Sequence, residues 1–233
     1  MRKFISLFIL FFSFFISSQD PLFTLVNAEE TGINFSNNLI DTSESNIFLY
    51  ANYYGGAGVG IGDFDNDGLE DIFFAGNIVE DKIYKNLGDF KFEDKTKFSG
   101  ITNDGSWSTG VTIADINNDG LLDIYVSCEL YDNDPKLRTN KLYINKGNFN
   151  FDEQASNWNV DVDRRTRHAV FFDYNKDGLL DLYLLNHPPN TGNFSPYYGT
   201  DMKLPEYNLQ LFENRGNFFE DVTSKAGLDR SGF

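Results

Sequence analysis

The chain has 233 residues, a formal net charge of −16 at pH 7 and 16% aromatic residues. Its length allows one or two domains, and its 24 Phe residues are enough for a substantial core. Phosphate groups repel so acidic a chain, which excludes nucleic acid and anionic membranes as its main partners. Cys128 is the only cysteine, so no internal disulfide can form, and we expect its side chain to be buried.

The first residues have the pattern of a secretory signal peptide. The basic residues Arg2 and Lys3 precede an apolar run of thirteen residues, Phe4–Ile16. This run is too short to span a bilayer, which takes about 20 apolar residues, although a membrane anchor is the alternative. We expect residues 1–18 to be removed. The mature chain, residues 19–233, is then secreted (extracellular or periplasmic) and does not insert into the membrane.

One nine-residue motif occurs three times and is the most informative feature of the sequence. Its copies begin at Asp63, Asp115 and Asp173, which lie 52 and 58 residues apart. Each copy has side-chain oxygens at positions 1, 3, 5 and 9 and a Gly at position 6. Ca²⁺ takes 6–8 oxygen ligands, which alternate residues around a sharp Gly turn can supply. A turn made of Asp, Asn and Gly is the alternative for one copy, but three matching copies favour calcium.

These loops differ from EF-hand loops. An EF-hand needs a bidentate Glu at position 12 between two helices, whereas position 12 is here Phe74, Val126 or Leu184 and the flanking residues favour strands. We therefore expect about three Ca²⁺, one in each β-hairpin loop, with position 7 contributing its backbone carbonyl. The predicted ligands are Asp63, Asp65, Asp67, Leu69 and Asp71; Asp115, Asn117, Asp119, Leu121 and Asp123; and Asp173, Asn175, Asp177, Leu179 and Asp181.

The similarity between the copies continues beyond the loop into an Asn-x-Gly hairpin, which gives four short strands per unit. In the first unit we expect strands at Gly58–Gly62, Asp71–Ala75, Lys82–Lys85 and Phe90–Glu93. The small residues of the first strand suit a crowded axis, and the apolar second strand suits a sheet that is buried on both faces. A repeated four-stranded sheet is typical of a propeller blade. A β-sandwich or a β-solenoid is the alternative.

These features resemble the FG-GAP/VCBS repeats of integrin-α-like β-propellers. They more closely resemble a secreted bacterial branch similar to cartilage acidic protein and the ASPIC/UnbV proteins. Gly58–Asp71, Gly110–Asp123 and Ala169–Asp181 carry the resemblance, which covers about residues 22–233. It implies one Ca²⁺ in the outer hairpin of each blade. Because Asn117 and Asn175 carry no charge, we expect the second and third sites to bind more weakly than the first.

The expected architecture is all-β, a partial or open β-propeller with about three four-stranded blades. Blades are expected at residues 54–101, 106–158 and 166–228. We expect the last strand of a preceding blade at residues 22–35 and the start of a next blade at residues 229–233. Closed propellers have typically 4–8 blades. Further blades from a longer parent chain, or an oligomer, are therefore expected to complete the ring.

No catalytic constellation is visible, since two His and one Cys leave little for metal hydrolysis or thiol chemistry. We expect a non-catalytic calcium-binding module that binds a protein or glycan, for example in adhesion at the cell surface. The alternatives are a propeller part or accessory subunit of a polysaccharide-active enzyme, and a structural spacer in a larger surface protein. Candidate binding features are the basic cluster 164–168 and the insertion 186–207. Trp107 and Trp158 could stack on a sugar or pack between blades.

Overall fold

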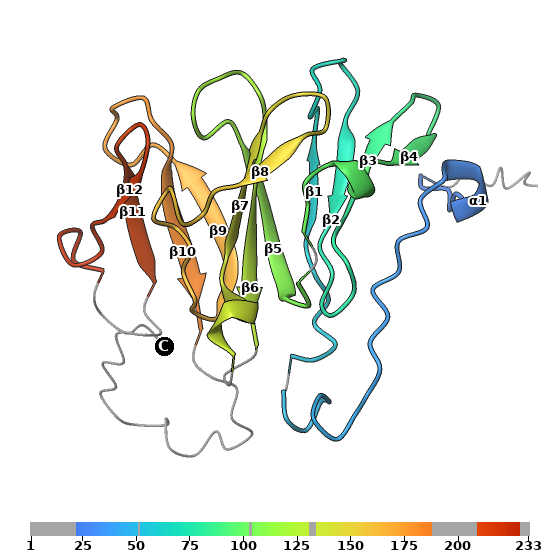
Figure 1. Cartoon of the computed structure of the whole chain (residues 1–233), viewed down its shortest axis with the longest axis horizontal. Helices are drawn as coiled ribbons and strands as arrows, with labels where there is room; N and C mark the ends of the chain where they lie inside the picture. Colours follow the sequence, from blue (N-terminus) through green and yellow to red (C-terminus); the bar gives the residue numbers. More distant parts are fainter. Residues whose placement is uncertain (1–21, 51, 103, 131–133, 188–208, 229–233) are drawn as a thin grey trace, which may run out of the picture.

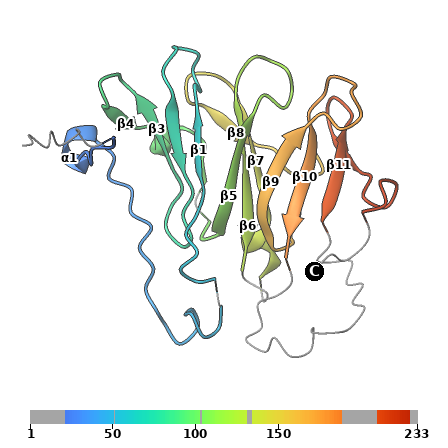
Figure 2. The same cartoon turned by 180° about the vertical axis from the view of Figure 1, so that it is seen from behind.

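The computed structural model describes residues 22–50, 52–102, 104–130, 134–187 and 209–228. In these residues, twelve strands form three four-stranded antiparallel sheets, which lie side by side in chain order (Figures 1 and 2). The first sheet consists of β1 (Val59–Gly62), β2 (Asp71–Phe74), β3 (Lys82–Asn86) and β4 (Phe92–Asp94). The second consists of β5 (Trp107–Ala114), β6 (Asp123–Glu129), β7 (Lys141–Asn145) and β8 (Phe151–Glu153). The third consists of β9 (Thr166–Phe172), β10 (Asp181–Asn186), β11 (Gln210–Asn214) and β12 (Phe219–Asp221).

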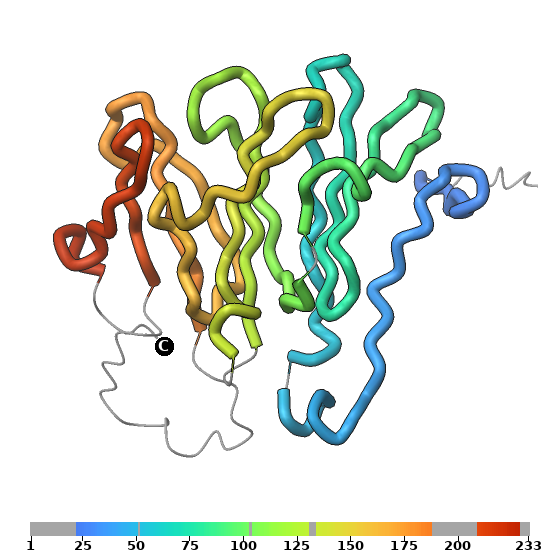
Figure 3. The backbone as a smooth tube through the Cα atoms, viewed as in Figure 1, coloured from blue at the N-terminus to red at the C-terminus, as the bar shows by residue number. Residues whose placement is uncertain are grey.

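Each sheet is an up-and-down meander that the chain completes before it begins the next one (Figure 3). The helical elements of the described residues are short: α1 (Ala28–Thr31) and the 3₁₀ turns η1 (Thr96–Phe98) and η2 (Pro135–Arg138). No helix in the described ranges is long and apolar enough to cross a bilayer. The sheets confirm the expected all-β fold with three propeller-type blades.

The first strands of neighbouring blades approach one another closely. The backbone N–H of Gly58 donates to the carbonyl of Thr109 at 2.5 Å. A Cβ atom on Gly60 would lie 2.7 Å from the side chain of Val111, and one on Gly110 would lie 2.7 Å from the carbonyl of Arg167. Small residues are therefore needed here because β1, β5 and β9 crowd together along one side of the arc, as the sequence predicts.

Apolar side chains fill the two spaces between the blades. Between the first and second blades, Phe64 and Phe73 pack with Ile124 and Phe151. Between the second and third blades, the core includes Tyr125, Leu142, Leu182 and Phe219. The middle blade is covered on both faces, so every residue of β6 is buried. Packing of adjacent blades is thus the main source of hydrophobic stabilisation.

Both Trp side chains and Cys128 belong to this interior. Trp107 is 1% exposed and packs against Tyr50 and Tyr53. Trp158 is 8% exposed and contacts the ring of Phe219 in the third blade. Neither indole offers an open face on which a sugar could stack. Trp158 packs between blades, whereas Trp107 packs on residues that precede the first blade. Cys128 is fully buried, as expected.

The hairpins between the third and fourth strands differ from the prediction at one end. The fourth strand of the first blade begins at Phe92, not at Phe90. Gly88, Asp89 and Phe90 all have positive φ values, of 83°, 49° and 55°. Three successive left-handed residues cannot belong to a strand, so the turn is longer than the Asn-x-Gly pattern indicates.

The predicted last strand of a preceding blade at residues 22–35 is wrong as a strand, because this segment contains α1 and irregular backbone. It nevertheless occupies the place of a blade end. A Cβ atom on Gly32 would lie 2.5 Å from the carbonyl of Phe92, and one on Gly100 would lie 2.1 Å from the carbonyl of Phe151. The segment that closes one blade thus packs on the fourth strand of the next. Ala28–Thr31 forms a helical turn that ends at Gly32, whose φ is 81°, so a strand cannot continue through this segment.

Several other predictions concern residues that lie outside the described ranges. These are the signal peptide at residues 1–18, nearly all of the insertion 186–207, and residues 229–233. The blade boundaries and the completion of the ring by further blades stay predictions. Within the basic cluster 164–168, Arg167 is bonded to the buried carboxylate of Glu129 at the end of β6. Tyr50 and His187 bind the same carboxylate, so this arginine forms part of an internal network.

Candidate metal centres in three hairpin loops

The three predicted calcium loops each join the first and second strands of a blade. We call them loop one (residues 63–71), loop two (residues 115–123) and loop three (residues 173–181). In loop one, the Asp63 carboxylate accepts the backbone N–H groups of Asp67 at 3.0 Å and of Gly68 at 2.8 Å. Asp115 and Asp173 repeat both hydrogen bonds at 2.9–3.1 Å. The position-1 carboxylate therefore folds each loop around itself.

The glycine at position 6 is needed for its backbone conformation. Gly68, Gly120 and Gly178 have φ values of 89°, 84° and 89°, which other residues rarely adopt. A Cβ atom at any of them would meet nothing within 4 Å. The requirement is thus the sharp turn and not lack of space, as expected for a loop that turns its side-chain oxygens inwards.

The aspartate at position 9 opens the second strand and is completely buried in all three blades. In loop one, the two oxygens of Asp71 accept the N–H groups of Phe64 at 2.9 Å and Asn86 at 2.8 Å. Burial raises the pKa of Asp71 and of Asp123 to about 6, and it also raises the pKa of Asp181. A cation beside these carboxylates would favour their ionised form.

Loop one contains the best-formed cation site of the described residues. Oxygens of Asp63, Asp65 and Asp71 all lie within 4.8 Å of one another, and no other such group of three occurs in the described part of the chain. The Oδ1 atom of Asp65 is buried and has no hydrogen-bond partner. An orphaned carboxylate oxygen beside two further carboxylates fits a hard cation. The fourth predicted carboxylate, Asp67, lies outside this group and binds Lys85.

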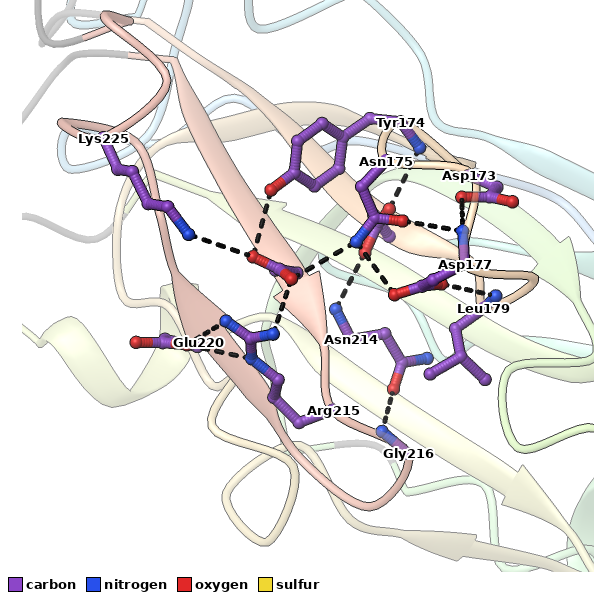
Figure 4. A network of polar contacts seen from close by, with 12 residues as sticks. Asp173, Tyr174, Asn175, Asp177, Leu179, Asn214, Arg215, Gly216, Glu220 and Lys225 are labelled. Carbon is purple, nitrogen blue, oxygen red and sulfur yellow. Dashed lines mark hydrogen bonds and ion pairs between the residues drawn. The ribbon is translucent and has the colours of Figure 1, made fainter.

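Loops two and three have the same backbone but a different position 3. The Asn117 side chain accepts the N–H of Asp119 at 3.0 Å and donates to its Oδ2 at 2.9 Å. Asn175 and Asp177 form the same pair at 2.9 and 2.8 Å (Figure 4). These amides bring an oxygen to the loop without a charge. Coordination by the backbone carbonyls of Leu69, Leu121 and Leu179 stays a prediction.

A second set of residues, which sequence reasoning treats only as turn residues, holds the loops in place. Asn86, Asn145 and Asn214 end the third strands, and their side-chain amides donate to the position-8 carbonyls of loops one, two and three at 2.8–3.0 Å. Two of them also reach the preceding blade. Asn145 donates to the carbonyl of Phe64 at 2.8 Å, and Asn214 donates to that of Ile116 at 3.3 Å. The signal in the sequence is that the same Asn recurs in all three units.

Comparisons with known proteins agree with this geometry. Residues 63–126, which include loops one and two, match the FG-GAP-like repeat family. The chain is also 33% identical over 101 residues to "Cartilage acidic protein 1" of Xenopus tropicalis. That alignment covers 43% of this chain and 16% of the relative. The similarity thus concerns a small part of a much longer protein.

Proposed function

We propose that this chain, which contains an FG-GAP-like repeat within an arc of three propeller-type blades, is a secreted, calcium-stabilised, non-catalytic module that binds a protein or glycan at the cell surface. The observation that carries the calcium part is the orphaned Oδ1 of Asp65 beside Asp63 and Asp71. The same loop backbone in all three blades supports one site per blade. Secretion rests on the sequence of residues 1–18.

The residues that would hold Ca²⁺ are those at positions 1, 3, 5, 7 and 9 of each loop. Bound Ca²⁺ would supply two positive charges to the clustered carboxylates of each loop. The protein residues supply the frame for it. The position-1 carboxylate folds the loop, the position-9 carboxylate fixes the loop to the second strand, and the third-strand Asn ties it to the sheet. Calcium would therefore stabilise the end of each blade at which the first and second strands are joined.

The binding part of the proposal concerns the opposite ends of the blades. The chain between β6 and β7 and the chain between β10 and β11 both leave the sheets at the ends remote from the calcium loops (Figure 1). Long connections on a rigid scaffold are where binding residues concentrate. A calcium-stiffened sheet would hold the strand ends from which these connections leave, Glu129 and Asn186, in a fixed arrangement.

Two measurements test the two parts of this function. Asp67→Ala removes a charged ligand and is expected to empty loop one alone, so the protein loses about one bound Ca²⁺. Glu93→Ala removes a carboxylate from the same blade outside the loop and should lose none. Retention of all calcium by Asp67→Ala would contradict the assignment of loop one.

Binding is tested on protein and glycan arrays, with the full chain in calcium and in chelator. Calcium-dependent capture of a defined glycan or protein without turnover supports a binding module. Cleavage of members of a polysaccharide panel would replace it with the enzyme-associated alternative, and absence of any ligand would favour a spacer.

A further inference from the structure

One position of the third strand differs in each blade, and in the first and third blades its side chain bonds to the residue at loop position 3. It precedes the loop-anchoring asparagine and is Lys85 in β3, Ile144 in β7 and Glu213 in β11. Pairing registers place these residues equivalently, since their preceding neighbours Tyr84, Tyr143 and Phe212 pair with the same position of the second strand. This position therefore provides an internal comparison of three otherwise similar loops.

In the first blade, this position brings a cation to loop one. The Nζ atom of Lys85 binds Oδ2 of Asp65 and lies 2.5 Å from Oδ2 of Asp67. It also lies 5.4 Å from the centre of the ring of Phe149, a buried residue of the second blade. The ammonium is thus held by the loop on one side and by the neighbouring blade on the other. The orphaned Oδ1 of Asp65 is the oxygen that Lys85 does not bind.

In the third blade, the equivalent residue is a buried carboxylate. Glu213 accepts a hydrogen bond from the amide of Asn175 at 3.2 Å and one from Tyr174 at 3.0 Å. Arg215 lies 2.5 Å from this carboxylate and also binds Glu220, and Lys225 lies 3.8 Å from it. Figure 4 labels Arg215, Glu220 and Lys225 in this network. In the second blade, the buried Ile144 offers no charge to Asn117.

Lys85 compensates the formal charge by which the ligand sets of the first two loops differ. Loop one has four ligand carboxylates, whereas loop two has three, because Asn117 replaces Asp65 at position 3. The four carboxylates of loop one together with Lys85 carry −3, as do the three carboxylates of loop two. Loop three also has three ligand carboxylates, and its additional carboxylate Glu213 belongs to a network with Arg215, Glu220 and Lys225.

We propose that Lys85 is a tethered cation of loop one: it balances Asp65 and Asp67 when no metal is bound and weakens the Ca²⁺ affinity of that loop. This inference rests on the proposed calcium binding. It removes the advantage in charge that the loop residues alone give to the first site over the second. Loop two adopts the same backbone hydrogen bonds without a lysine, so Lys85 is not needed for the shape of the loop. The positive charge of Lys85 is therefore the feature at this position that distinguishes loop one from loop two.

The test uses the full chain and the amide NMR signals of Gly68, Gly120 and Gly178, which report loops one, two and three separately. Lys85→Met keeps the length and apolar stem of the side chain and removes its charge. We expect the calcium dissociation constant seen at Gly68 to fall about tenfold, as removal of a positive charge near a divalent cation requires, and those at Gly120 and Gly178 to stay unchanged. The melting temperature in chelator should also fall.

Two control variants isolate the effect of the charge at this position. Lys85→Arg retains the charge and is expected to keep the affinity of loop one within about threefold of that of the wild-type protein. Lys95→Met removes a lysine that pairs with Glu93 on the same blade, away from the loop, and should not alter any of the three signals. Unchanged or weaker calcium binding at Gly68 in Lys85→Met would overturn the inference.

Failure of the proposed function has a different signature. If calcium shifts none of the three glycine signals in the wild-type protein, the loops are not calcium sites. Melting temperatures in chelator still test whether Lys85 balances Asp65 and Asp67 in the absence of metal. Lys85→Met must then melt lower than Lys95→Met, and equal melting temperatures would overturn it.

Discussion

The side-chain amide of Asn145 in the second blade donates a hydrogen bond to the backbone carbonyl of Phe64 in loop one, at a distance of 2.8 Å. The same amide binds the carbonyl of Leu122 in loop two at 3.0 Å. One fully buried side chain thus joins two neighbouring loops. Asn214 makes the corresponding link between loops two and three. The three loops are therefore connected to one another through these asparagines.

Asn145→Ala should destabilise the protein by about 2–4 kcal/mol, because it leaves the carbonyl of the buried Phe64 and that of the half-buried Leu122 without this donor. It should also weaken calcium binding at loops one and two together. Asn86→Ala is the matched control, since Asn86 binds the carbonyl of Glu70 in its own, more exposed loop. Urea unfolding in calcium and in chelator checks both variants. Equal losses in the two variants would show that the link between blades contributes nothing.

The turns that close each blade provide a steric test of how blades stack. Gly100 and Gly227 both have positive φ, of 82° and 71°. Only at Gly100 does the next blade lie in the way, since a Cβ atom there would be 2.1 Å from the carbonyl of Phe151. Replacement by Ala is expected to cost about 1 kcal/mol at Gly227, from backbone strain alone. At Gly100 the cost should exceed 3 kcal/mol, because the backbone must move. Thermal unfolding distinguishes them, and equal effects would contradict the stacking.

Much of this architecture could be predicted from the sequence because the information is local and repeated. Loop residues, Gly turns and alternating apolar strands recur in each unit, so the sheets follow from the pattern. The ends of elements were harder to predict, as at Phe90, where two residues after Gly88 also take left-handed conformations. The strand predicted at residues 22–35 is wrong because Ala28–Thr31 forms a helical turn that Gly32 ends.

The finer features of the site could not be predicted for a related reason. Lys85, Ile144 and Glu213 are ordinary strand residues in the sequence, and the strand registers show that their positions are equivalent. Only the folded structure shows that Lys85 and Glu213 bond to loop position 3. The link from Asn145 to Phe64 joins residues 81 positions apart, a contact that requires two packed blades. A sequence pattern within one repeat therefore does not predict the contacts between repeats.

The buried carboxylate of Asp81 provides a pH test that does not involve the loops. Burial raises its pKa from 3.8 to about 6, although the N–H of Gly76 and the hydroxyl of Ser108 both donate to it. A raised pKa means that the folded state favours the protonated form. The contribution of Asp81 to stability is therefore present below pH 3.8 and is lost as the pH rises through 6.

Asp81→Asn should abolish this cost, because an amide can accept from Gly76 and donate to Ser108 without a charge. We expect similar stabilities of the two proteins near pH 4. Near pH 7.5 the variant should be more stable by about 2–3 kcal/mol, the equivalent of roughly two pKa units. Urea unfolding in chelator at both pH values checks this. A variant that is less stable than the wild-type protein at pH 7.5 would show that the ionised form is favoured by the fold.

The most direct test of whether three metal-closed loops stabilise the three blades measures bound calcium and the melting temperature of the full chain, with and without EDTA. We expect about three Ca²⁺ per chain and a large decrease in melting temperature on chelation. A protein without bound calcium, whose melting temperature EDTA leaves unchanged, would reduce the three loops to Asp, Asn and Gly turns.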